Sequence, residues 1–152
     1  MGRGLLSGLW DVEAAIYTGP VPSEDSVECG HQRTEIALRA ARCEAERNGW
    51  AVSIAIVDGA GEPLGLVKLD GSPSDSARRA IAKAQGAAAF EQRGQTEEGV
   101  FLERAANVWC SPGATSIYVE NRCIVAIGVE AEDQSNATQL AKTAAQSFMR
   151  AS

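Results

Sequence analysis

Residues 50–70, WAVSIAIVDGAGEPLGLVKLD, decide the fold. From Trp50 to Val57 apolar side chains occupy every second position, and most of the intervening positions are apolar too, so the segment predicts a strand that is covered on both faces. The letters DGAG at 58–61 predict a turn, because glycine adopts positive φ without steric cost. Residues 64–69 then pair back as the second strand of a hairpin.

Helices are predicted on both sides of this hairpin. Helical spacing predicts one over 32–48, with Ile36 and Cys43 on one face and a row of alanines beside it, and Asn48-Gly49 as its stop signal. A second helix, capped by Ser74 or Asp75, runs to about residue 92 and is rich in alanine. Such small side chains let a helix pack closely on a sheet or on another subunit.

The second half of the chain repeats the same order. Residues 100–107 are predicted to form a short helix, and the alternation at 116–120 and 123–129 predicts a second hairpin. Asp133 or Ser135 opens a last helix with an apolar face. Hairpins require antiparallel pairing, so we expect an α+β fold: a mostly antiparallel five-stranded sheet with helices packed on it.

The length of the chain and the positions of its glycine and proline residues predict one domain with an N-terminal extension. The chain has 152 residues, which fits a single core. Residues 1–28 are broken by glycine and proline, so we expect an extension that is a flexible arm, an oligomer contact or a lid, and a domain over 29–152.

Charge and composition exclude several functions. The net charge of −6 disfavours binding to phosphate backbones, so we expect no nucleic-acid partner. No apolar run approaches the ~18 residues that a membrane span needs, and we expect no membrane partner. The first ten residues do not resemble a secretory signal, so a cytoplasmic protein with reduced cysteines is expected. One histidine, His31, excludes multi-histidine metal sites within one subunit.

Several motifs resemble those of the GlcG/HbpS-like family, also called the haem-degrading domain family. The family's VSIAVxDxGG strand is similar to residues 52–61, and its RxD and KAxTA motifs are similar to residues 68–70 and 83–87. The resemblance covers about 32–150. The chain departs from the family's VSG motif, because Glu130 introduces a carboxylate where the family keeps a small hydroxyl. We therefore expect a changed ligand or a changed chemistry if that position lines a pocket.

The resemblance implies a profilin-like α/β/α arrangement, a homo-oligomer and a small-molecule ligand. Some family members bind haem, and in some of these a histidine near the first helix binds the iron. His31 lies at the same place in this chain, so it is the candidate haem-iron ligand, with an exposed or capping residue as the alternative.

The remaining candidate site residues are charged. Lys83 lies within an alanine-rich stretch, where it is either a base or anion anchor, or a structural partner of Asp58, Asp70 or Glu130. Lys68 and Asp70 are candidate ligand-binding residues at the rim of a pocket, with a solvated turn as the alternative.

Asp133 joins this set as a further candidate ligand-binding residue, with a helix-terminal carboxylate as the alternative.

Two main functions follow from these residues. The first is a small-molecule-binding protein with haem as the first ligand to test. The alternative is a cofactor-independent lyase, isomerase or cyclase in which Lys83 and Glu130 are catalytic acid and base groups. A structural or regulatory subunit with an empty pocket is the third hypothesis.

Overall fold

The computed structural model describes residues 15–16, 30–98, 106–119 and 122–151. Within these residues the helices are α2 (Gly30–Asn48), α3 (Ser76–Glu98) and α4 (Gln134–Arg150). The strands are β1 (Ala15–Ile16), β2 (Ser53–Asp58), β3 (Pro63–Lys68), β4 (Ala106–Ser111), β5 (Ala114–Val119) and β6 (Arg122–Glu130). The α+β class is therefore confirmed, and so are the three long helices.

The strands form one antiparallel sheet in the order β1-β4-β5-β6-β2-β3. The predicted number of five strands is wrong. Four strands, β5-β6-β2-β3, are the two predicted hairpins, and β4 and β1 are added beside β5. The short helix predicted over 100–107 is also wrong at its described end, because Ala106 and Asn107 begin β4 and pair with Tyr118 and Ile117 of β5. Residues 99–105 lie outside the described part.

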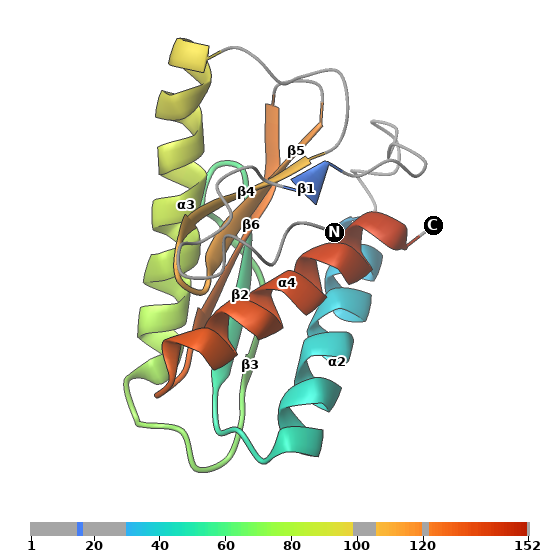
Figure 1. Ribbon diagram of the computed structural model, residues 1–152, viewed down its shortest axis with the longest axis vertical. Helices are drawn as coiled ribbons and strands as arrows, with labels where there is room; N and C mark the ends of the chain where they lie inside the picture. Colours follow the sequence, from blue (N-terminus) through green and yellow to red (C-terminus); the bar gives the residue numbers. More distant parts are fainter. Residues whose placement is uncertain (1–14, 17–29, 99–105, 120–121, 152) are drawn as a thin grey trace.

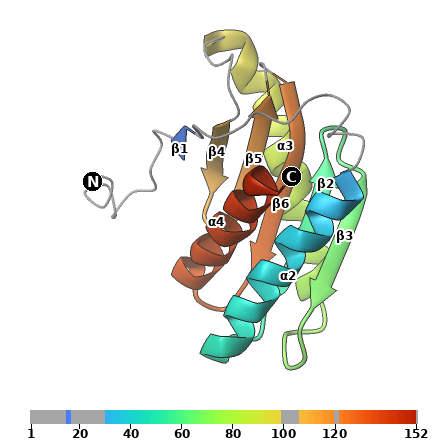
Figure 2. The same ribbon diagram turned by 90° about the vertical axis from the view of Figure 1, so that its right-hand side faces the viewer.

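The sheet is covered by helices on both faces, as the predicted α/β/α arrangement requires. Helices α2 and α4 lie side by side on one face, and α3 lies on the other (Figure 1, Figure 2). No helix in the described ranges is long and apolar enough to cross a membrane.

Strand β2 is buried on both faces because its side chains alternate between two cores. Val52, just before the strand, Ile54 and Ile56 pack with α2 and α4, whereas Ala55 and Val57 pack with the alanines of α3. The prediction that the strand within residues 50–57 is covered on both faces is therefore confirmed.

The buried face of α2 is the row of alanines and not the row that contains Ile36. Ile36 is 44% exposed and Cys43 is exposed, while Ala37 and Ala41 are fully buried. The small residues face inward because α2 packs against both the sheet and α4, and its Leu38 lies directly over Gly65 of β3. The row that contains Ile36 consequently points to solvent.

Helix α3 packs on the sheet at backbone contact. A Cβ on Gly128 of β6 would overlap the carbonyl oxygen of Ala80 and would lie 2.5 Å from the backbone nitrogen of Ala84. Ala80 and Ala84 are fully buried at this crossing. The alanine-rich composition of α3 thus serves close packing on β6.

Candidate functional site

A row of polar residues crosses three strands at one end of the sheet. Ser53 of β2 is the register partner of Lys68 on β3 and also of Glu130 on β6. Register partners point to the same face, and here it is the face of α3, because the Ser53 hydroxyl hydrogen-bonds the Ser76 hydroxyl at 2.7 Å. Both serines are buried, so the first turn of α3 is joined to the sheet inside this row.

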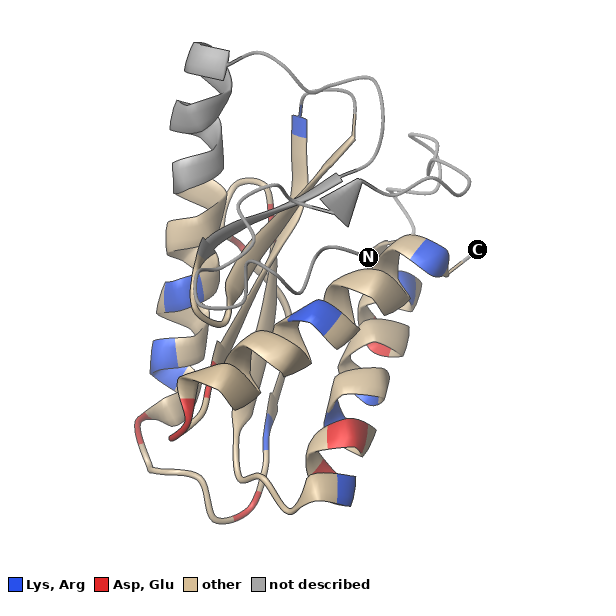
Figure 3. Ribbon diagram, in the orientation of Figure 1, with Lys and Arg blue, Asp and Glu red and all other residues tan. Residues whose placement is uncertain are grey.

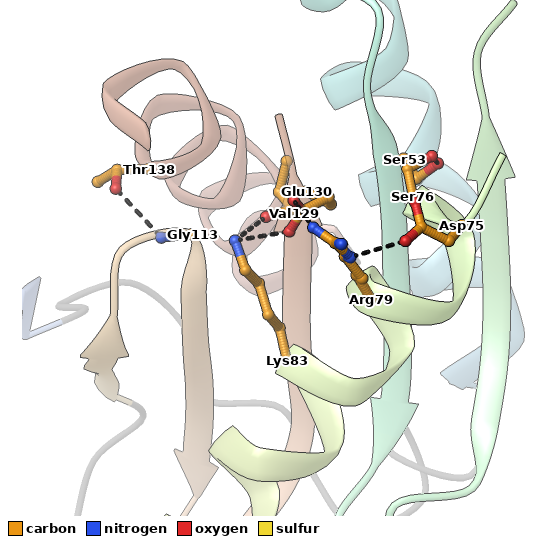
Figure 4. A network of polar contacts seen from close by, with 9 residues as sticks. All are labelled: Ser53, Asp75, Ser76, Arg79, Lys83, Gly113, Val129, Glu130 and Thr138. Carbon is orange, nitrogen blue, oxygen red and sulfur yellow. Dashed lines mark hydrogen bonds and ion pairs between the residues drawn. The ribbon is translucent and has the colours of Figure 1, made fainter. Parts of the chain in front are cut away.

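Lys83 of α3 meets the end of β6 at this site. Its Nζ donates to the carbonyl oxygen of Val129 at 2.8 Å and lies 3.2 Å from Oε1 of Glu130 (Figure 4). The two side chains are 22% and 21% exposed. The structure therefore brings the two predicted acid and base residues into direct contact.

Arg79 and Asp75 extend this contact along α3. Arg79 Nη1 lies 3.7 Å from Oε2 of Glu130, and its Nε lies 3.0 Å from Asp75 (Figure 4). Asp75 was predicted only as a candidate helix cap, and Arg79 was not predicted as a site residue. Their signal was the spacing of Asp75, Arg79 and Lys83, because residues four apart lie on one helix face.

The backbone of Gly113 supports this site through two hydrogen bonds. Gly113 has a φ of 79°, and its carbonyl accepts a hydrogen bond from the Val129 N–H at 2.8 Å. Its own N–H donates to the Thr138 hydroxyl at 3.1 Å. A Cβ on Gly113 would lie 2.8 Å from the Val129 carbonyl oxygen, the atom that Lys83 binds, so the close approach requires glycine.

Asp133 caps α4 beside this row and is exposed. Its Oδ1 accepts hydrogen bonds from the backbone N–H and the hydroxyl of Ser135, at 2.9 and 2.7 Å. These hydrogen bonds to the charged form lower the pKa of Asp133 below its usual value. The predicted start of the last helix is confirmed, and the ligand-binding role of Asp133 stays a prediction.

Lys68 and Asp70 line a separate shallow hollow of about 360 Å³ at the same end of the sheet. Trp50 and Glu46 contribute to its wall. Lys68 Nζ donates to the carbonyl and hydroxyl oxygens of Ser72, at 3.1 and 2.9 Å, so it also holds the turn after β3.

Asp58 belongs to another turn. Its Oδ1 accepts hydrogen bonds from the N–H groups of Ala60 and Glu62, both at 2.9 Å, which closes the β2–β3 hairpin. Of the three carboxylates considered for Lys83, Glu130 is the one that pairs with it.

His31 lies at the opposite end of the molecule. Arg33, two residues later, donates to the carbonyl oxygen of Phe148 at 2.8 Å, so α2 begins beside the end of α4. Glu130 precedes the start of α4, whose 17 residues span ~25 Å. His31 is exposed, and it is not brought together with Lys83 and Glu130 within one chain.

His31 is a single candidate ligand, so it could bind the iron of a haem but could not form a metal site made of several protein ligands. Within the described ranges no group of three or more His, Cys, Asp or Glu side chains could hold a metal ion. An exposed imidazole at a helix start can supply one axial ligand to a haem that brings its own four nitrogens. His31 therefore fits that group by chemistry.

Comparison with known proteins gives a family and a fold. The family described as haem degrading protein HbpS-like matches residues 31–146. No curated protein matches the chain. Among solved structures, the Klebsiella pneumoniae protein ORFY is 17% identical, with a TM-score of 0.64 over 80% of this chain and 91% of its own.

Two further solved structures share the fold. A double mutant of HbpS from Streptomyces reticuli is 25% identical, with a TM-score of 0.58 over 76% of this chain and 84% of its own. A structure described as a PduOC:heme complex is 19% identical, with a TM-score of 0.61 over 76% and 91%.

Proposed function

Since this chain belongs to the HbpS-like family of haem-degrading proteins, we propose that it binds a small molecule and that haem is this ligand. The family match over residues 31–146 supports the proposal, and so does the shared fold with a protein solved as a haem complex. The observation in this chain that carries it is His31, an exposed imidazole in the first turn of α2.

His31 would hold the haem by binding its iron through the imidazole. When bound, haem would supply the iron and its redox chemistry, while this chain would supply the ligand and the orientation. The imidazole of His31 makes no hydrogen bond or ion pair with the described residues, so ligation would break no contact among them.

Titration of the purified full chain with haemin tests this proposal. We expect a saturable shift of the Soret band that the His31→Ala variant loses. Gln32→Ala is the matched control, because Gln32 is exposed in the same turn, and it should bind as the wild type does.

The two unfavourable outcomes have different meanings. A wild-type titration without a saturable shift would exclude haem as the ligand. A shift that survives in His31→Ala, with an unchanged circular dichroism spectrum, would exclude His31 as the axial ligand.

The contacts at Lys83 do not support the lyase, isomerase or cyclase alternative. Its ammonium already donates to Val129 and pairs with Glu130, and Glu130 receives a second cation from Arg79. We propose that Lys83 and Glu130 join α3 to β6, and that the predicted ligand residues Lys68, Asp70 and Asp133 belong to the turns and helix start at the same end.

A further inference from the structure

The end of α2 and the turn after β3 lie at the same end of the molecule (Figure 1), and the shallow hollow of about 360 Å³ lies between them. This volume is within the range of small-molecule sites. Three segments form its wall: the last turn of α2, residues 50–51, and the end of β3 with its turn. His31 begins the other end of α2, ~22 Å away along the helix axis, so the hollow is separate from the proposed haem contact.

Internal hydrogen bonds fix both sides of the hollow. On one side Gly49 follows α2 with a φ of 73°, and its N–H donates to the Glu46 carbonyl at 3.2 Å. On the other side the Ser72 hydroxyl donates to the Leu69 carbonyl at 2.7 Å and accepts from Lys68 Nζ at 2.9 Å. A site whose walls are already ordered loses little conformational entropy when a ligand binds.

The hollow carries a net negative charge. Glu46 and Asp70 supply two carboxylates, and the carbonyl end of α2 adds partial negative charge. The lysine in the wall, Lys68, directs its ammonium to the carbonyl and hydroxyl oxygens of Ser72, at 3.1 and 2.9 Å. Arg42 lies 3.6 Å from Glu46, whereas the side chain of Asp70 makes no hydrogen bond or ion pair with the described residues. Asp70 is therefore the carboxylate that a bound cation would neutralise.

The rest of the wall is apolar and aromatic. Trp50 and Leu69 are partly buried against the core between the sheet and the helices α2 and α4. Indole is the strongest aromatic partner for a cation, and quaternary ammonium groups are recognised in this way. Their methyl groups also gain from contact with an apolar wall. A metal ion fits less well, because the described ranges contain no group of three side chains that could hold one.

We propose that this hollow binds a small quaternary ammonium compound, with its cationic head against the Trp50 indole and beside the Asp70 carboxylate. Glu46 adds a second negative charge from the opposite wall. Asp70 belongs to the turn that Lys68 holds, so the contacts that order this turn also position the carboxylate. The site is a second ligand site, at the end of α2 that is remote from His31.

Titration of the isotope-labelled full chain with choline, followed by NMR, tests this site. Potassium chloride at equal ionic strength is the reference, so that the general effect of salt is subtracted. We expect saturable shifts of the Trp50 indole signal and of the Gly49 and Asp70 amide signals. The neutral carbon analogue of choline, dimethylbutanol, should bind at least ~5-fold more weakly, because it has the shape without the charge.

Variants of the wall separate the aromatic contribution from the charge. Asp70→Asn should raise the dissociation constant for choline at least ~3-fold, and since Asp70 is exposed the fold should be kept. Trp50→Leu keeps an apolar side chain but removes the indole, and it should raise the constant at least ~3-fold, with Trp50→Phe in between. Glu35→Gln is the matched control, because it removes an exposed carboxylate from the same helix ~16 Å from Glu46. Its affinity should equal that of the wild type.

Shifts that do not saturate, or that the neutral analogue reproduces at equal concentration, would overturn the proposal. An unchanged affinity in Asp70→Asn or in Trp50→Leu would overturn it too. An equal loss in Glu35→Gln would show attraction to the net charge of −6 alone, and would also exclude the site. His31→Ala should bind choline as the wild type does, so a failed haemin titration and a failed choline titration are separate results.

Discussion

Lys83 and Glu130 are 47 positions apart in the chain, yet Nζ of the lysine lies 3.2 Å from Oε1 of the glutamate. The same Nζ binds the Val129 carbonyl at 2.8 Å. One side chain of α3 thereby fixes the point at which β6 leaves the sheet and turns toward α4 (Figure 4). Since both groups are mostly shielded from water, this pair should matter more for stability than the exposed ion pairs of the chain.

Lys83→Met should lower the free energy of unfolding by about 1–3 kcal/mol, because it leaves the Val129 carbonyl without its donor and Glu130 with one cation. Urea denaturation followed by circular dichroism measures the change. Arg42→Met is the matched control: Arg42 pairs with Glu46 on an exposed surface of α2, and its loss should cost at most about 0.5 kcal/mol. Equal losses in the two variants would contradict a stabilising role for the Lys83 pair.

Gly128→Ala should destabilise the fold by at least about 3 kcal/mol or prevent folding, because the added methyl would enter the backbone of α3. Gly86→Ala is the matched change in α3. A Cβ there meets open space, so this variant should gain about 0.5–1 kcal/mol from helix propensity. Thermal unfolding of both variants decides the point, and a Gly128→Ala protein as stable as wild type would disprove the backbone contact.

Thr34→Val should stabilise the protein by about 1 kcal/mol. The Thr34 hydroxyl is buried and has no hydrogen-bond partner among the described residues, so valine removes a polar group that burial penalises. Thr143→Val is the contrasting variant and should destabilise, because the Thr143 hydroxyl donates to Glu44 at 2.6 Å. Denaturation midpoints that move in the same direction would count against this account.

Asp133→Ala should lower the melting temperature by a few degrees at neutral pH, because it removes the cap of α4. The folded-state pKa of Asp133 is lowered by its hydrogen bonds to Ser135, so its contribution is present above the usual pKa of 3.8. That contribution is lost as the pH falls through the lower folded-state pKa. Melting curves of both proteins should therefore converge at strongly acid pH, and a constant difference would refute the charged cap.

Figure 3 shows charged residues of both signs on α2 and at the ends of the strands. The sequence alone does not show which of these charged residues lie close to one another. The sequence predicted the hairpins at 53–68 and 114–130 because alternation and turn residues are local signals. Strand β4 was missed because its state depends on pairing with β5, which is tertiary.

The candidate site was also predicted only in part. Lys83 and Glu130 stood out as charges at positions that matter to the family motifs, and the structure joins them. Arg79 was missed although its helical spacing from Lys83 was visible. The distance between His31 and this pair could not be predicted, because it follows from the antiparallel packing of α2 beside α4, which places the start of α2 next to the end of α4.

The bare backbone of Gly128 against Ala80 and Ala84 also determines how this protein can move. A helix that packs through large side chains can shift over a sheet when those side chains change rotamer, but at this contact the backbone of α3 itself lies against Gly128. The part of α3 near Ala80 and strand β6 are therefore expected to move together as a rigid unit. Any ligand that displaces this part of the helix will pull the middle of the sheet with it.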